Sequence, residues 1–256
     1  MTNKGVEGQN MDISVIVPTY LEEDYIEEAL NRLGKANHVA KLSGIESEIL
    51  VVDSGDDKTF DIAKGIADKV FKFTERGFSK ARNFGASKAS GRVLLFTDAD
   101  VRAPANWFEE VWKTFRDLRV IAAISYTVPY KSLHLSPFER MFYKLDHLYI
   151  KTCAKWKALL RFYSRGDGLA IRKDALTKVG GFNEEINVGE VSELLLKLSK
   201  IGEVAVFNIP VEESARRLKE WGVLRTYLKW WRDYVSYYSL NRPFSNVYST
   251  VRGKTR

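Results

Sequence analysis

Val93-Leu94-Leu95-Phe96-Thr97-Asp98-Ala99-Asp100 places two carboxylates two residues apart, directly after an apolar run. A short apolar run of this kind is typical of a buried strand in a parallel sheet. Open α/β sheets bind their ligands at the carboxyl edge, where Asp98 and Asp100 would emerge. Their oxygens suit Mg²⁺ or Mn²⁺ shared with a diphosphate, but the same triplet alone also fits a solvated turn or a helix cap.

Strands and helices alternate on the N-terminal side of this stretch. Three β-rich runs predict strands at residues 13–17, ended by Pro18, at 48–52 and at 70–73. Between them the pattern predicts helices that reach Leu33, that run from about Thr59 to Ala67, and that lie between Gly77 and Ala89. This order favours an α/β fold with a mostly parallel central sheet flanked by helices.

The sequence lacks the glycine-rich loops of two common classes of nucleotide-binding protein. Pro18-Thr19-Tyr20-Leu21-Glu22 contains no glycine, whereas a dinucleotide-binding loop needs several for its backbone to approach the pyrophosphate. The chain also has no glycine-rich loop that ends in Lys-Ser or Lys-Thr. NAD-dependent enzymes and P-loop NTPases are therefore disfavoured.

Five segments in order resemble the family 2 glycosyltransferases of GT-A fold. They are Ile16–Glu22, Val51–Thr59, Ala81–Gly85, Asp98–Asp100, and the region from Gly168 through Val179–Phe182 to Gly189-Glu190. The similarity covers about residues 12–232. It implies a GT-A nucleotide-diphospho-sugar transferase fold and an inverting sugar transfer that uses a nucleotide diphosphate sugar and Mn²⁺ or Mg²⁺.

The resemblance also implies roles for individual residues. Asp53 would accept a hydrogen bond from the donor base, Arg82 would lie near the diphosphate with Arg76 and Lys80, and Asp98 would lie near the ribose. Asp100, with Asp98, would hold the metal. The remaining donor-site candidates are Pro18, Thr19, Tyr20, Glu22 and Ala99, with Arg217 and Trp221 in a segment that closes over the donor. Outside the family context, Asp53 reads as a turn residue and Arg82 as a surface ion pair.

The catalytic base departs from the family pattern. Members usually carry a Glu-Asp pair after a glycine, but this chain reads Gly189-Glu190-Val191. An inverting transfer needs a base for the acceptor hydroxyl, and Glu190 is the first candidate. Glu193 is the second, at the start of a predicted helix where it could also serve as a cap. Asp167 lies in a loop that the family places near the acceptor. Leu21 is a smaller departure, since many relatives have Asn there.

Composition and charge place the protein in a broad class. The chain has 256 residues, 45% of them hydrophobic, and one cysteine, which favours a reducing compartment. We expect no leader and no spanning segment, and hence a cytoplasmic protein. Of the net charge of +7, residues 131–165 carry eight basic against two acidic side chains, and residues 211–256 ten against four. The rest of the chain is therefore acidic.

The basic segments carry aromatic and aliphatic side chains. Residues 138–163 repeat apolar positions at helical spacing with Lys and Arg between them. This pattern fits a helix packed on the sheet equally well as a helix lying on an anionic membrane surface. The aromatic residues after Trp221 fit a core, a homodimer contact or a membrane contact.

We therefore expect a disordered N-terminus (1–10), a GT-A domain (11–210) with a nucleotide-binding half (11–118) and an acceptor half (119–210), a helical C-terminal extension (211–240) and a basic tail (241–256). The expected activity is transfer from a UDP-sugar, with a GDP-sugar possible, to a lipid-linked or surface-glycan acceptor. Two alternatives remain. One is a catalytically impaired nucleotide-sugar-binding protein, motivated by Val191. The other is a basic nucleic-acid-binding protein, which is disfavoured because no nucleic-acid module is recognised.

Overall fold

The computed structural model describes most of the chain. The described residues are 11–130, 136–156, 159–160, 163, 165–186 and 189–214, together with Arg216, Glu220, Gly222, Arg225, Leu228, Arg232 and Ser236. The disordered N-terminus predicted at 1–10 and the basic tail predicted at 241–256 lie outside these residues.

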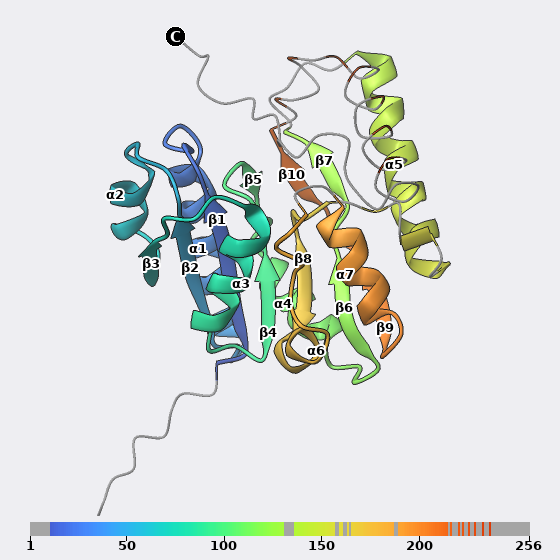
Figure 1. Ribbon diagram of the computed structural model, residues 1–256, viewed down its shortest axis with the longest axis horizontal. Helices are drawn as coiled ribbons and strands as arrows, with labels where there is room; N and C mark the ends of the chain where they lie inside the picture. Colours follow the sequence, from blue (N-terminus) through green and yellow to red (C-terminus); the bar gives the residue numbers. More distant parts are fainter. Residues whose placement is uncertain are drawn as a thin grey trace, which may run out of the picture.

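A seven-stranded sheet in the order β3-β2-β1-β4-β8-β6-β9 forms the centre of the molecule (Figure 1). Its strands are β1 (Ile13–Thr19), β2 (Ser47–Asp53), β3 (Lys69–Lys72), β4 (Val93–Phe96), β6 (Val120–Ile124), β8 (Leu169–Arg172) and β9 (Glu203–Val206). Strand β8 runs antiparallel to both of its neighbours, and the other pairs are parallel. The predicted mostly parallel α/β sheet is confirmed.

Helices cover both faces of this sheet (Figure 1). One face packs against α1 (Ile26–Leu42), α2 (Thr59–Lys64) and α4 (Trp107–Thr114), and the other against α3 (Phe78–Lys88), α6 (Lys173–Lys178) and α7 (Glu190–Leu198). Each face has its own apolar core. The long helix α5 (Pro137–Lys155) lies beside β7 and β9. Across the described residues, no helix combines the length and the apolar character that crossing a bilayer requires.

A second, three-stranded sheet lies at the carboxyl edge of the first (Figure 1). It consists of β5 (Val101–Arg102), β10 (Val211–Glu213) and β7 (Thr127–Pro129), with β10 in the middle. The helical extension predicted from residue 211 is therefore wrong at its start, because Val211–Glu213 form a strand. Strands of two or three residues are too short to show a period in the sequence.

Three predicted boundaries also change. Strand β1 continues through Pro18 to Thr19. The pairing of β1 with β4 ends at Ile16, so Pro18, which has no amide hydrogen, interrupts no hydrogen bond between these two strands. Helix α1 continues past Leu33 to Leu42, because Ala36 and Ala40 remain buried on the same face. Helix α7 begins at Glu190, so Glu193 lies inside it rather than at its start.

Two helical glycines provide a matched test of how α3 packs on the sheet. A Cβ added at Gly85 would lie 2.5 Å from Ile16 Cγ2, whereas a Cβ at Gly34 in α1 would meet nothing within 4 Å. We expect Gly85→Ala to lower the free energy of unfolding by about 1–3 kcal/mol through overpacking. Gly34→Ala should raise it by up to about 1 kcal/mol, because alanine favours the helix. Urea denaturation of both variants measures this, and a stabilised Gly85→Ala would contradict the packing.

Candidate active site

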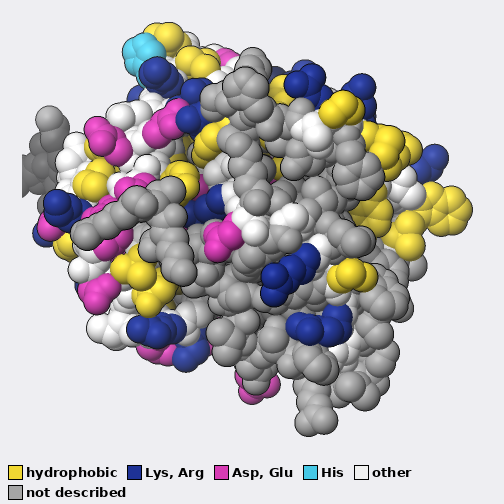
Figure 2. All heavy atoms as spheres, turned by 90° about the horizontal axis from the view of Figure 1, so that it is seen from above, with side chains coloured by type: hydrophobic (Ala, Val, Ile, Leu, Met, Phe, Trp, Pro, Cys, Tyr) yellow, Lys and Arg dark blue, Asp and Glu magenta, His cyan; other side chains and the backbone are white. Residues whose placement is uncertain are grey.

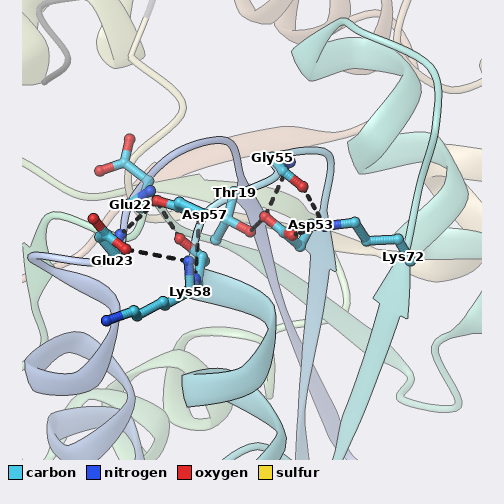
Figure 3. Close-up of polar contacts among 9 residues, drawn as sticks. Thr19, Glu22, Glu23, Asp53, Gly55, Asp57, Lys58 and Lys72 are labelled. Carbon is cyan, nitrogen blue, oxygen red and sulfur yellow. Dashed lines mark hydrogen bonds and ion pairs between the residues drawn. The ribbon is translucent and has the colours of Figure 1, made fainter.

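The ends of β1, β2 and β3 are joined through the carboxylate of Asp53 (Figure 3). Asp53 is fully buried, and its Oδ1 accepts hydrogen bonds from the Thr19 hydroxyl at 2.8 Å and the Gly55 amide at 3.2 Å. Its Oδ2 accepts a hydrogen bond from Lys72 Nζ at 2.9 Å, and Lys72 also donates to the Gly55 carbonyl. Asp53, which is predicted to bind the nucleobase of the donor, therefore also fixes the loop after β2. An N–H group of the nucleobase would have to share the Asp53 carboxylate with Thr19, Gly55 and Lys72.

The loop after β1 is tied to the start of α2 (Figure 3). The Glu22 amide donates to Thr59 Oγ1 at 2.9 Å, the Glu23 amide to Asp57 Oδ2 at 3.1 Å, and the Lys58 amide to Glu23 Oε2 at 3.2 Å. Leu21 in this loop has a φ of 57°. Asn tolerates this left-handed region better than Leu, which gives a physical reason for the Asn that many relatives carry there.

Arg82 joins four elements of the site. It projects from α3, is only 4% exposed, and donates from Nη1 to Glu190 Oε1 at 2.9 Å. Its Nη2 lies 3.7 Å from Asp98 Oδ1 at the end of β4. A Cβ added at Gly166 would lie 2.1 Å from Nη2, so the guanidinium packs directly on that backbone. Arg82 therefore brings α3, the end of β4, the loop before β8 and the start of α7 to one place.

The other two basic candidates on this side lie further out. Arg76 lies over the ring of Tyr20, with Cζ 5.3 Å from the ring centroid. Lys80 forms an ion pair with Glu75 at 2.6 Å, which raises the pKa of its ammonium. Of the three basic residues predicted near a diphosphate, Arg82 is the one buried within the carboxylate cluster.

Asp167 lies buried in the same cluster. Burial raises the pKa of its carboxyl well above the ordinary value; the nearby Arg165 opposes this shift, and the charges of Glu213 and Asp98 reinforce it. Arg165 Nη1 lies 4.0 Å from Asp167 Oδ2 and 3.0 Å from Glu213 Oε2. Glu213 belongs to β10, so the second sheet contributes directly to this site.

The three predicted base candidates have different surroundings. Glu190 is buried at the first position of α7, where burial raises the pKa of its carboxyl and Arg82 opposes the shift. Val191, at the position where family members usually carry Asp, is fully buried in the apolar core. Glu193 forms an ion pair with Lys197, one turn further along α7, at 3.0 Å.

Asp100 is held by residues that follow β10. Its Oδ2 accepts a hydrogen bond from the Ser214 hydroxyl at 2.7 Å and lies 3.1 Å from Arg216 Nε. Arg216 also bonds both carboxylate oxygens of Glu22, at 2.9 and 3.0 Å. The family resemblance predicts donor-site roles for Arg217 and Trp221, which both lie outside the described residues. The adjacent arginines indicated this segment, but nothing in their order distinguished Arg216 from Arg217.

The two aspartates of the triplet fit a divalent ion that takes only part of its coordination from protein. The described residues contain no cluster of three or more His, Cys, Asp or Glu side chains that could enclose a metal. Mg²⁺ and Mn²⁺ readily accept one or two carboxylates and complete their shell with phosphate oxygens and water. Asp98 and Asp100 are partly exposed at the carboxyl edge, as such sharing requires.

The chain belongs to the Glycosyl transferase family 2, whose sequence profile matches residues 14–180. It is 36% identical over 100 residues to the dolichol-phosphate mannosyltransferase of Pyrococcus furiosus, a match that spans 37% of this chain and 27% of that protein. The chain thus spans well under two thirds of this relative's length.

Solved structures share the fold. The mannosyltransferase PcManGT of Pyrobaculum calidifontis, in complex with GDP-Man and Mn²⁺, superposes with a TM-score of 0.60 at 22% identity, over 88% of this chain and 66% of that one. Staphylococcus aureus TarS, in complex with UDP-GlcNAc, gives a TM-score of 0.61 at 20% identity, over 78% of this chain and 57% of that one. The predicted GT-A fold and family are therefore confirmed.

Proposed function

We propose that the protein is a metal-dependent inverting glycosyltransferase that uses a nucleotide diphosphate sugar and acts on a lipid-linked or surface-glycan acceptor. The observation that carries this proposal is the convergence of Asp53, Asp98, Asp100 and Glu190 at the carboxyl edge of one sheet. Arg82 lies between two of them and contacts both Asp98 and Glu190. In open α/β sheets this edge is where ligands bind.

The donor would lie along the ends of β1, β2 and β4. Thr19, Tyr20, Glu22 and Asp53 border the nucleoside end, and Arg82 is the buried cation nearest the diphosphate. A UDP-sugar is favoured because the similar structures include TarS with UDP and with UDP-GlcNAc, and a GDP-sugar is possible because they also include one structure with GDP-Man.

Asp100 and Asp98 are the residues that would hold the metal. When bound, a divalent ion neutralises the negative charge that develops on the leaving diphosphate. The protein's own part is to orient the two substrates: the acceptor oxygen attacks the anomeric carbon as the bond to the diphosphate breaks, and a carboxylate takes the hydroxyl proton.

Glu190 is our assignment for that carboxylate. It lies beside Arg82, which fixes its position, and its raised pKa brings the carboxyl closer to the range in which a base works well. Asp167 shares the cluster and is the second candidate. Glu193 is the third candidate, because its ion pair is with Lys197 one turn further along α7.

Donor binding is tested by thermal melting of the protein with UDP, GDP, CDP or dTDP and their sugars, with and without Mn²⁺. A ligand at one hundred times its Kd should raise the melting temperature by about 5–10 °C, because it binds only the folded state. Asp100→Ala should keep the fold and lose the Mn²⁺-dependent part of this shift, along with donor turnover. An Asp100→Ala variant with unchanged turnover would exclude the metal assignment.

The base is tested by comparing Glu190→Gln, Asp167→Asn and Glu193→Gln in steady-state kinetics. Glu190→Gln should lower kcat by about 10²–10⁴-fold while the donor Kd changes little. In the unmodified enzyme kcat should rise with pH through the raised pKa of Glu190, because only the deprotonated carboxylate accepts the proton. The largest loss in Asp167→Asn or Glu193→Gln would transfer the role to that residue. Donor binding without turnover under any acceptor would support the impaired binding protein suggested by Val191.

We also propose that α5 rests on an anionic membrane surface. Its buried side chains, Tyr143, Ile150 and Cys153, share one face. Side chains on the opposite face are apolar yet exposed: Met141, Leu145, Leu148, Tyr149 and Trp156, with Leu148 and Trp156 each 63% exposed. At 100° per residue, the exposed cations Arg140, Lys144, Lys151 and Lys155 form a neighbouring stripe. Figure 2 shows apolar and basic side chains together on the side where α5 lies in Figure 1.

This pairing of an apolar stripe with a basic stripe is the pattern of a helix lying in an anionic interface. The protein should sediment with phosphatidylglycerol vesicles. The double variant Leu145→Glu/Leu148→Glu should bind these vesicles at least tenfold more weakly, since burial of each leucine in the membrane contributes about 1.5–3 kcal/mol to binding. Leu42→Glu/Leu118→Glu, which changes two other exposed leucines, is the matched control. Equal binding by both double variants would exclude the proposal. Self-association that disappears only in Leu145→Glu/Leu148→Glu would assign the face to a homodimer.

A further inference from the structure

One guanidinium joins two carboxylates that the donor site needs. Arg216 forms a two-pronged contact with Glu22, from Nη1 to Oε2 at 2.9 Å and from Nη2 to Oε1 at 3.0 Å. Its third nitrogen, Nε, lies 3.1 Å from Asp100 Oδ2. Glu22 follows β1 on the nucleoside side, and Asp100 follows β4 on the metal side. Arg216 therefore spans the two ends of the proposed donor site.

The fold brings Arg216 to Glu22 across 194 residues of the chain. Strand β10 inserts between β5, which directly follows Asp100, and β7. Ser214, just after β10, donates its hydroxyl to the same Asp100 oxygen that faces Arg216. The guanidinium also lies over the ring of Tyr25, with Cζ 4.8 Å from the ring centroid, and the side chain is only 16% exposed. Arg216 is thus held by several elements rather than by one surface ion pair.

The contact joins one positive and two negative groups. A guanidinium is always protonated in proteins, and here it has carboxylate partners on both sides, Glu22 and Asp100. Arg216 thus stays a cation and satisfies Asp100 Oδ2 in the protein as described. A divalent cation that binds the same carboxylate would meet the positive charge of Arg216 at close range, and two cations that share one carboxylate repel each other.

We propose that Arg216 is an internal counter-cation that occupies the metal aspartate until a nucleotide diphosphate arrives. This inference rests on the proposed function, because it concerns the same donor site. The diphosphate offers Arg216 a new anionic partner, and Arg216 turns from Asp100 toward it. Asp100 Oδ2 is then available to the divalent ion that enters with the nucleotide.

A consequence is that metal and nucleotide each strengthen the binding of the other through Arg216. Thermodynamic reciprocity requires the same factor in both directions. The free protein would then bind a divalent ion weakly, and its donor site would assemble only when both ligands are present. Without the Arg216 guanidinium, the binding of the nucleotide should have much less effect on the binding of the metal.

The test measures Mn²⁺ binding from the electron paramagnetic resonance signal of free Mn²⁺, first without nucleotide and then with saturating UDP or GDP. Arg216→Met keeps the length of the stem and removes the charge. It should bind Mn²⁺ alone at least tenfold more tightly than the unmodified protein. The factor by which the nucleotide strengthens Mn²⁺ binding should fall at least tenfold. Arg119→Met removes the same charge from a side chain that is 73% exposed and paired with Asp117, and should change neither quantity.

Arg216→Lys provides a second variant in case the methionine disturbs the fold, which thermal melting would reveal. A lysine keeps the charge but cannot bond Glu22 with a fork while it also holds Asp100. The Arg216→Lys protein should bind Mn²⁺ in the absence of nucleotide at least threefold more tightly than the unmodified protein does. Unchanged or weaker binding of Mn²⁺ alone in the folded variants would overturn the inference.

The two proposals fail in different ways. If the unmodified protein binds no nucleotide diphosphate with Mn²⁺, the proposed function fails, and the Mn²⁺ titration of Arg216→Met without nucleotide still decides whether Arg216 occupies the metal aspartate. If the unmodified protein binds the nucleotide while Arg216→Met shows the same coupling factor as Arg119→Met, the function stands and Arg216 has no part in the coupling.

Discussion

The parallel pairing of β1 with both β2 and β4 is the constraint on which the site depends. Ile13–Thr19 pairs residue by residue with Ser47–Asp53 on one side, and Ile13–Ile16 pairs with Val93–Phe96 on the other. Since the three strands point the same way, the loops that follow them meet at one edge. Thr19, Asp53 and Asp98 are distant in sequence but lie at the same edge of the sheet. The pairing of the strands, rather than contacts between these side chains, brings them there.

Charge is the second organising feature of this edge, and it is balanced inside the protein. Three mostly buried arginines each join carboxylates from different elements: Arg82 holds Glu190 and Asp98, Arg165 holds Glu213 and Asp167, and Arg216 holds Glu22 and Asp100. The more exposed Lys72 pairs with the buried Asp53. A buried carboxylate without a partner would be strongly destabilising. A bound diphosphate, as proposed, would attract the same cations. Binding of an anionic substrate would thus exchange partners within an existing set of charges.

The sequence predicted the parts of this arrangement that are encoded locally. Strand cores such as Ile13–Val17 and Val93–Phe96 have an apolar, β-branched pattern, and the motif order identified the family. The second sheet was not predicted, because β5, β7 and β10 have only two or three residues and depend on long-range pairing. The contact between Arg216 and Asp100 depends on that sheet, so it was hidden for the same reason. Glu193 was placed at a helix start because α7 was predicted one turn too short.

Val191 changes what the start of α7 can do chemically. The side chain has no exposed surface and packs with the core on that face of the sheet, so this position faces the interior. Glu190, one residue earlier and about 100° around the helix, faces Arg82 and the carboxylate cluster instead. A carboxylate at 191 would have to be buried beside apolar side chains, whereas the one at 190 already has a charged partner. If Glu190 is the base, as proposed, the acceptor hydroxyl has to approach from the side of Arg82, and the orientation of the acceptor would then depend on α3 as much as on α7.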